Sequence, residues 1–415
     1  MTASPTSPAG RREVITVYAI GLFQGLSLVA FPAAAIVLTS KTGYDLSKNQ
    51  YGILFLPQVI LAIASSLALP ALARRFGLKR VLLAGLIANT LAMSLLVGSY
   101  PLRSDAAAYP MLLLATASLG LGFGLALGST STYAGAFMPD RRAVALTSLN
   151  VLLGLGTALS PLLIAVFTAV GQWWYLPLLA AAGLAVLTAA TLAQPMSLPD
   201  VETSTGAAET PAGKAAIPRL FWLFAAALVI YGLAETMFGN WGTTLLTGRG
   251  VKPDSANDAL AAFWAAVTIG RLLIALVSAK IPSTLSYVVL PWAIGVALLL
   301  APTARSGGAG IAVFALGGLA CSGFFPMTVG YGESTFPTMV ELAAGWLIAA
   351  YQLGYGIAAF GAGALQNVIS LSAIFRLVAV LVVPMAVLAT VIARRTGQST
   401  AKPSPAADNL ARKLS

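Results

Sequence analysis

Glu235 and Arg271 are ionisable residues that lie inside long apolar stretches of the sequence. Glu235 is flanked by Leu233, Met237 and Phe238, and a charge in the middle of a lipid-spanning helix costs at least ~2.5 kcal/mol. Such a residue normally faces a cavity or a partner, so two interpretations stay open. Glu235 either exchanges protons as a coupling residue or forms a fixed structural ion pair with Arg271. For Arg271 itself we favour a structural or gating role.

Three amide side chains are candidates for binding a solute through hydrogen bonds. Gln24 shares one helix face with Ser27 and Phe31, because the three residues are spaced by three and four positions. Asn150 and Gln352 are the other two amides, and we expect both to be buried. Each amide either orients a solute or ties two helices together, and the sequence leaves these roles open.

Aromatic residues and missing motifs narrow the chemistry further. Trp241, Trp264 and Tyr355 could stack on a sugar ring, although packing is the commoner role of such residues. The sequence has no phosphate-binding Gly-x-x-x-x-Gly-Lys-Ser/Thr loop, which argues against ATP-driven transport. It has no histidine, and Cys321 is its only cysteine, so the usual zinc and haem ligands are missing. We therefore expect neither a cofactor nor a metal.

The composition of the chain indicates a membrane protein. The 415 residues are 58% hydrophobic and 9% charged, with a mean hydropathy of +0.87, whereas soluble domains carry about 25% charged residues. The apolar runs are long and continuous, which favours spanning helices over the alternating strands of a barrel. The first run, 14–38, is too long for the apolar core of a signal peptide, so we interpret it as an uncleaved span.

An all-α membrane fold with twelve transmembrane helices is predicted. The spans are expected at 14–38, 50–73, 80–100, 110–137, 144–170, 173–194, 219–246, 259–280, 285–303, 309–331, 341–369 and 373–394. With a cytoplasmic N-terminus, sixteen of the 24 Lys and Arg residues fall on the cytoplasmic side and six on the other side. This bias follows the positive-inside rule, places both termini in the cytoplasm, and explains the net charge of +11 without a nucleic-acid partner.

The chain divides into two halves of six spans. A polar segment at 195–218 has little to bury and is expected to be a cytoplasmic linker between halves at 14–194 and 219–394. Cytoplasmic tails are expected at 1–13 and 395–415. Gly154-x-Gly156-x-Ala158 and Gly354-x-Gly356-x-Ala358 repeat at an offset of 200 residues, which indicates that the halves are related.

The loop after the second span resembles the signature of the major facilitator superfamily. That signature reads Gly-x-x-x-Asp-Arg-x-Gly-Arg-Arg/Lys, and Arg75, Gly77, Lys79 and Arg80 fit it. Two positions depart from it: Pro70 replaces the usual Gly, and Arg74 replaces the usual Asp. The resemblance implies a loop that participates in the conformational change, to which we add Arg141 after the fourth span.

Within the superfamily, four short stretches resemble the fucose–galactose–glucose:proton symporters and their uncharacterised bacterial relatives. These are Pro139-Asp-Arg141-Arg142 with Leu149-Asn150, then Tyr231-Gly232-Leu-Ala-Glu235 with Trp241, then Phe263-Trp264 before Gly270-Arg271, and Gln352 with Gly354-x-Gly356. The resemblance implies a solute site between the halves. The sequence departs from the pattern because spans 1 and 4 lack the acids that bind protons in such symporters.

Together these features predict a secondary active transporter of a small polar solute, sugar-like or another metabolite, with protons as the coupling ion. We expect Glu235, Gln24, Arg271, Asn150, Gln352, Tyr231, Trp241 and Phe31 to serve binding or coupling, in a monomer within a bacterial cytoplasmic membrane. A drug or metabolite exporter of the same fold is the alternative, since Gly156-Thr-Ala-Leu-Ser160-Pro161 partly matches an exporter signature. A non-transporting sensor is a remote alternative, and an enzyme is not expected.

Overall fold

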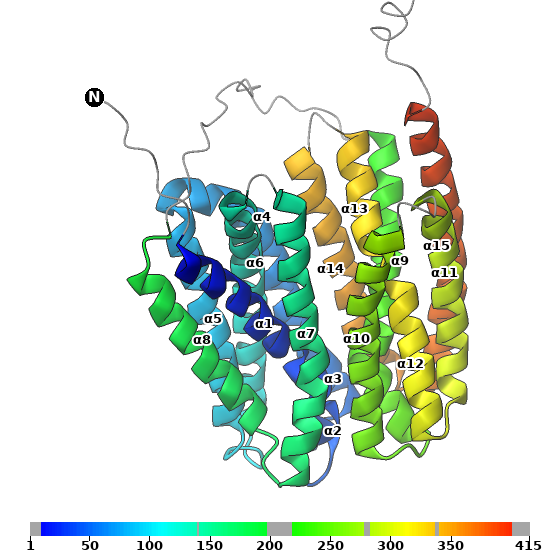
Figure 1. The fold of residues 1–415 in the computed structure, drawn as a ribbon. Coiled ribbons are helices and arrows are strands. Elements are labelled where there is room, and N and C mark those ends of the chain that lie inside the picture. Colours follow the sequence, from blue (N-terminus) through cyan, green and yellow to red (C-terminus); the bar gives the residue numbers. More distant parts are fainter. Residues whose placement is uncertain (1–9, 139–140, 197–217, 278–282, 337–339, 401–415) are drawn as a thin grey trace, which may run out of the picture.

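The chain folds into a bundle of long helices (Figure 1). A computed structural model describes residues 10–138, 141–196, 218–277, 283–336 and 340–400. Over these residues twelve helical segments are long and apolar enough to cross a membrane, which confirms the predicted all-α, twelve-span fold. Most of the predicted linker and most of both predicted tails lie outside the described residues.

Over the described residues, eight helices form the first half of the bundle and seven form the second. The first half contains α1 (Arg11–Ala33), α2 (Ala35–Thr39), α3 (Lys48–Ile53), α4 (Phe55–Phe76), α5 (Leu78–Ser99), α6 (Ala108–Phe137), α7 (Arg142–Ala169) and α8 (Tyr175–Ala193). The second contains α9 (Arg219–Gly248), α10 (Pro253–Val277), α11 (Ser283–Leu300), α12 (Gly307–Cys321), α13 (Phe324–Thr335), α14 (Val340–Leu365) and α15 (Leu371–Thr400), with a 3-10 turn at Ala301–Thr303. The two halves stand side by side (Figure 1).

The described chain begins and ends at the same end of the bundle. The start of α1 and the end of α15 both lie there (Figure 1), and we call it the terminal end and the opposite one the far end. Two boundaries differ from the predicted ones by more than four residues. Helix α15 continues to Thr400, and α10 begins at Pro253, where proline at the first helical position and Asp254 beside it favour an earlier start.

Three of the twelve spans are interrupted helices. Span 1 breaks at Ala34, just after Pro32, and span 2 breaks at Leu54, three residues before Pro57. Span 10 breaks between Cys321 and Phe324, where Gly323 precedes Phe324-Phe325-Pro326. Proline removes a backbone donor, so the preceding turn loses hydrogen bonds that must be replaced inside the protein. The break in span 10 leaves the carbonyl of Cys321 at a helix end, where it is available to another helix.

Glycines bring the paired helices of each half into backbone contact. A Cβ on Gly25 of α1 would collide with the backbone at Leu153 and Thr157 of α7, and a Cβ on Gly232 of α9 with the backbone at Tyr351 and Tyr355 of α14. The α7 residues correspond to the α14 residues at an offset of 198, from 351 − 153 and 355 − 157. Gly156 therefore corresponds to Gly354, and the repeat offset of 200 predicted from the sequence is wrong by two residues.

Gly354→Ala should destabilise the protein, whereas Gly361→Ala on the same helix should not. A Cβ at position 354 would overlap the backbone carbonyl of Val229 on α9, while a Cβ at position 361 has no atom within 4 Å. Overpacking of this kind costs about 1–3 kcal/mol, and alanine in a helix is intrinsically favoured over glycine by about 1 kcal/mol. Thermal unfolding of the two purified variants checks this, and equal melting temperatures would contradict the assigned contact.

The loop between α4 and α5 has the backbone that its glycine predicts. Gly77 adopts a φ of +85°, a conformation that favours glycine. Lys79 donates hydrogen bonds from Nζ to the carbonyls of Leu192 and Gln194, at 3.1 Å and 2.5 Å, and so binds the carboxyl end of α8. Arg75 lies over the Phe76 ring at 5.1 Å, and Arg80 is exposed. Their role in a conformational change stays a prediction.

Candidate functional site

A cavity of about 280 Å³ lies between the two halves and is called the central cavity. Helices of both halves line it: α1, α6 and α7 from the first, and α9, α10, α13 and α14 from the second. Its polar and ionisable lining includes Ser131, Asn150, Thr157, Glu235, Thr268, Arg271, Tyr351 and Gln352. The cavity thus gathers side chains that are far apart in the sequence, as the predicted site between the halves requires.

The central cavity narrows toward the far end, where the halves are in contact. The next chamber has only about 50 Å³ and shares Tyr351, Gln352 and Trp264 with the central cavity. Beyond it the hydroxyl of Tyr51 donates to the carbonyl of Asn240 at 3.2 Å, which joins α3 to α9 across the halves. Edge-on ring contacts of Tyr51 with Phe55 and Trp241, each at 5.2 Å, fill the space.

Larger chambers continue from the central cavity toward the terminal end. A chamber of about 380 Å³, the inner chamber, shares Asn150, Thr268, Arg271 and Phe325 with the central cavity. An outer groove of about 840 Å³, the vestibule, in turn shares Thr147, Val151 and Leu272 with the inner chamber. Neighbouring chambers therefore share parts of their walls, and their volumes increase from Glu235 toward the terminal end.

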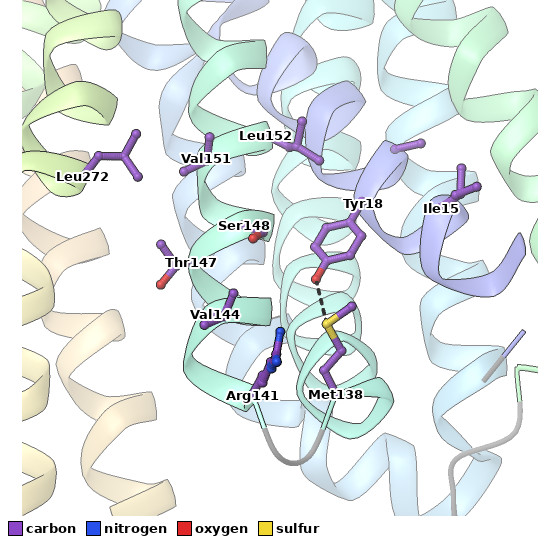
Figure 2. A pocket seen from close by; sticks show the side chains of 11 residues that line it. Ile15, Tyr18, Met138, Arg141, Val144, Thr147, Ser148, Val151, Leu152 and Leu272 are labelled. Carbon is purple, nitrogen blue, oxygen red and sulfur yellow. Dashed lines mark hydrogen bonds between the residues drawn. The ribbon is translucent and has the colours of Figure 1, made fainter. Parts of the chain in front are cut away.

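The vestibule is mainly apolar, and its described lining includes one guanidinium group. Figure 2 shows α7 side chains such as Val144 and Val151 facing it, with Ile15 on α1 and Leu272 on α10 at its sides. The hydroxyl of Tyr18 donates to the carbonyl of Ala145 at 3.3 Å and lies 4.0 Å from the sulfur of Met138. Arg141, which we predicted to act in the conformational change, is an exposed residue of this groove.

The Glu235 carboxyl is held by two tyrosine hydroxyls. Tyr231 lies one turn earlier on α9, and its Oη is 2.7 Å from Glu235 Oε1. Tyr351, on α14, donates to Glu235 Oε2 at 2.6 Å. Tyr231 Oη is also 2.8 Å from the carbonyl oxygen of Cys321, at the break in span 10. One buried acid, 4% exposed, therefore links spans 7, 10 and 11.

The number of available protons decides which of these three short contacts can be hydrogen bonds. A tyrosine hydroxyl has one proton to donate, and a backbone carbonyl only accepts. If Tyr231 donates to Cys321, its contact with Glu235 is a hydrogen bond only when the carboxyl carries the donated proton. A protonated Glu235 thus satisfies all three contacts at once, whereas an ionised Glu235 and Cys321 compete for a single proton.

Arg271 is close to this network but is not its partner. The carboxyl of Glu235 is bound by tyrosines, and among the described residues the Nε of Arg271 is buried without a hydrogen-bond partner. Arg271 lines both the central cavity and the inner chamber. The fixed ion pair that the sequence left open is therefore not formed in this conformation.

The predicted amides on α7 and α14 differ in exposure. Gln352 is 8% exposed and lines the central cavity, as expected. Asn150 also lines it, but the expectation of a buried amide is wrong for this residue. Asn150 is exposed to the chambers because α7 faces open space there, and its Nδ2 donates to the Leu146 carbonyl of its own helix at 2.9 Å.

Four predicted site residues lie outside the chambers: Tyr231, which contacts Glu235 without lining a chamber, and three that lie farther away. Gln24 donates from Nε2 to the carbonyl of Phe123 at 3.3 Å, which ties α1 to α6. Phe31 is fully buried in the core. Trp241 is also fully buried and donates from Nε1 toward the carbonyls of Ala358 and Ala359, at 3.2 Å each, in the far-end contact. In this conformation these three side chains hold helices together.

Sequence reasoning missed Tyr351, although it singled out its neighbour Gln352. No sequence signal marks Tyr351, and only the helix contacts place it: Gly232 on α9 approaches its backbone as Gly25 on α1, at an offset of 207, approaches that of Leu153. At that offset Leu28 corresponds to Glu235, and both line the central cavity. The first half thus presents an apolar residue where the second half presents an acid.

Metal binding has no support in the described part of the chain. No group of three acids or cysteines that could hold a metal ion is found among the described residues. The donors that do converge on the cavity are hydroxyls, amides and a guanidinium, which bind organic solutes or anions.

Comparisons with known proteins agree with the fold. Residues 16–290 match the family model described as the Major Facilitator Superfamily. A crystal structure of a mutant of the nucleoside transporter NupG is similar, with a TM-score of 0.70 and 12% identity over 94% of this chain and 100% of that chain. A D-xylose–proton symporter is similar with a TM-score of 0.71 and 13% identity over 93% and 96%. A comparison with curated proteins gives no match.

At these identities the likeness to solved structures concerns the fold alone, and the fucose–galactose–glucose subtype stays a prediction. The family match extends over most of the chain. The twelve apolar helices of this chain, arranged in two halves around a shared cavity, have the architecture of those solved structures. The chain therefore belongs to the major facilitator superfamily and is a multi-pass membrane transporter rather than an enzyme.

Proposed function

We propose that the protein is a secondary active transporter that moves a small polar solute by alternating access. The observation that carries the proposal is the asymmetry of the chambers. They widen from the central cavity to the terminal end, whereas Tyr51, Asn240 and Trp241 close the far end. Rocking of the two halves would close the opening at the terminal end and separate the contact at the far end. This is the usual motion of two-repeat transporters.

The helix pairs that cross between the halves suit this motion. Gly154 on α7 lies against the Thr268 side chain on α10, and Gly356 on α14 lies against the Val59 side chain on α4. Glycine leaves each crossing without a bulky side chain, so the backbones can approach and slide. These two contacts sit on opposite sides of the pseudo-symmetric bundle and are the pivots we propose.

We further propose that Glu235 carries the coupling proton. Its carboxyl is buried, lines the cavity, and has neutral hydrogen-bond donors as partners instead of a fixed counter-ion. A carboxyl in this setting can exist as an acid or as a carboxylate without losing an ion pair. Gradient coupling also accords with the lack of a phosphate-binding loop in the sequence.

The terminal end is proposed to be cytoplasmic, in a bacterial cytoplasmic membrane. The excess of Lys and Arg on that side supports this orientation. The segments 1–13, 195–218 and 395–415 would then be cytoplasmic tails and a linker. We propose that the monomer is the working unit, because helices of one chain enclose the whole central cavity.

Cysteine labelling tests this orientation without a cysteine-free background. Cys321 is the only cysteine and is fully buried, so the wild-type protein should stay unlabelled by a membrane-impermeant maleimide. Ser148→Cys, in the vestibule, should label only in inside-out vesicles, and Ser104→Cys, in the exposed α5–α6 loop at the far end, only in intact cells. The reverse pattern would invert the proposed topology.

Uptake into proteoliposomes tests the function itself. We expect one or more polar solutes from a panel of sugars, nucleosides and small organic acids to accumulate under an inward proton gradient and to stop accumulating when an ionophore dissipates it. The apolar vestibule also fits the exporter alternative, since Ile15, Val144 and Leu272 would suit a lipophilic cargo. Gradient-driven expulsion of lipophilic cations, with no polar solute moved, would favour that alternative and contradict our proposal.

A further inference from the structure

Along the described route from the terminal end to Glu235, the charged side chains that come before Glu235 are all positive. Arg141 lies in the vestibule, and Arg271 lies where the inner chamber meets the central cavity. Among the described lining residues Glu235 is the single acid, and it is at the end of the route. A cationic solute would meet like charge along this path, whereas an anion would be attracted.

Arg271 offers an unused binding group at the centre of the route. Its Nε is buried and has no hydrogen-bond partner among the described residues, although nearby Asn150, Thr268 and Phe325 line the same two chambers. A buried guanidinium nitrogen without a partner is costly, and the planar fork of the half-buried Arg271 side chain matches a carboxylate bidentately. A bound carboxylate would supply the missing acceptors.

The Glu235 network determines the charge balance of the cavity. The three contacts around Glu235 are all satisfied when the carboxyl is protonated, as counted above. In that form the carboxyl is neutral, and the described lining of the central cavity retains one positive charge, on Arg271. The inner chamber, which Arg271 also lines, meets the start of α13 at Gly323 and Phe325, and the amino end of a helix adds positive potential.

The remaining walls restrict the body of the solute. Phe123, Leu127, Trp264 and Phe325 are apolar or aromatic, and Trp264 Nε1 is a buried donor with no partner among the described residues. A volume of about 280 Å³ lies just below the range of roughly 300–1,000 Å³ that holds drug-sized ligands. The space therefore suits a compact solute with an apolar side and a few acceptors.

We infer that the transported solute is a small organic monocarboxylate, bound through its carboxylate by Arg271 and carried together with one proton on Glu235. This inference rests on the proposed transport function and specifies its substrate class. One positive charge on Arg271 selects a single negative charge on the solute, and the proton on Glu235 allows both to cross as a neutral pair.

Binding to the purified full-length protein tests the inference without transport. The probes are lactate, glycerate, pyruvate and benzoate, each paired with its amide, together with D-xylose and uridine. At least one carboxylate should raise the melting temperature more than its amide does. Arg271→Gln should weaken the binding of that carboxylate by at least about tenfold, because hydrogen bonds to a charged group are lost. Arg271→Lys should recover part of the affinity.

The control is Arg305→Gln, which removes one charge from an exposed residue outside the chambers and should bind like the wild type. Melting of each unliganded variant shows that it is folded. The inference is overturned if no carboxylate stabilises the protein more than its amide, or if Arg271→Gln binds carboxylates unchanged.

The two proposals can fail separately. Gradient-driven accumulation of D-xylose or uridine without any carboxylate binding would leave the transport function standing and would overturn the monocarboxylate. Carboxylate binding that depends on Arg271, without flux in proteoliposomes under any gradient, would support the anion site and overturn the transport function.

Discussion

Glu235→Gln is expected to abolish accumulation against a gradient while leaving exchange of solute across the membrane intact. The amide reproduces the hydrogen bonds of the protonated acid: its oxygen accepts from Tyr351, and its nitrogen donates to Tyr231, which then donates to Cys321. The variant should therefore fold and bind solute. It has no proton to release, so the proton gradient can no longer drive the cycle.

The expected effect is large. With one proton per solute, a difference of two pH units sustains a concentration ratio of about 100, since each unit corresponds to 1.36 kcal/mol. The Gln variant should equilibrate its solute at a ratio of about 1, with counterflow exchange near the wild-type rate. Glu333→Gln on α13 is the matched control, because this half-buried acid does not line the chambers and should leave accumulation unchanged. Full accumulation by the Glu235→Gln variant would contradict a coupling role for Glu235.

The accumulation ratio of a monocarboxylate taken up by the wild-type protein should not depend on the membrane potential. The anion and the proton on Glu235 cross as a neutral pair, so no net charge moves in the loaded step. Moving one charge across 100 mV corresponds to about 2.3 kcal/mol, or about 50-fold in the accumulation ratio. A neutral solute carried with a proton would show that dependence, and a carboxylate carried with a proton would not.

A potassium diffusion potential imposed on proteoliposomes measures this directly. We expect equal accumulation ratios at 0 and 100 mV for the carboxylate that binds best, under a constant pH gradient. Protein-free liposomes correct for passive entry of the undissociated acid. A ratio that rises by more than about tenfold with an inside-negative potential would mean that net positive charge crosses, and would contradict the neutral pair.

Much of the architecture could be predicted because lipid imposes simple constraints on sequence. Each span needs a continuous apolar run, and loops carry the charges, so all twelve spans were identified to within a few residues. The interrupted spans were not predicted. Proline and glycine occur in many of these helices, and only tertiary packing determines where a break is tolerated, as between Cys321 and Phe324.

The candidate site was predictable in part for the same reason. An acid inside an apolar run is rare enough to stand out, so Glu235 was found from the sequence alone. Its partner Tyr351 is 116 residues away, and nothing local marks it as different from other tyrosines. Trp241 and Phe31 have the residue types of a solute site, but they face neighbouring helices, and helix orientation is decided by backbone contacts such as those at Gly25 and Gly232.

Proton movement caused by the solute is the most direct test of coupling through Glu235. Proteoliposomes containing a trapped pH-sensitive dye are given an inward gradient of the best-bound solute, with no pH gradient at the start. We expect acidification of the lumen by wild-type protein, in step with solute entry, and none beyond the passive background with Glu235→Gln. Solute entry without acidification, or equal acidification by both proteins, would contradict coupling through Glu235.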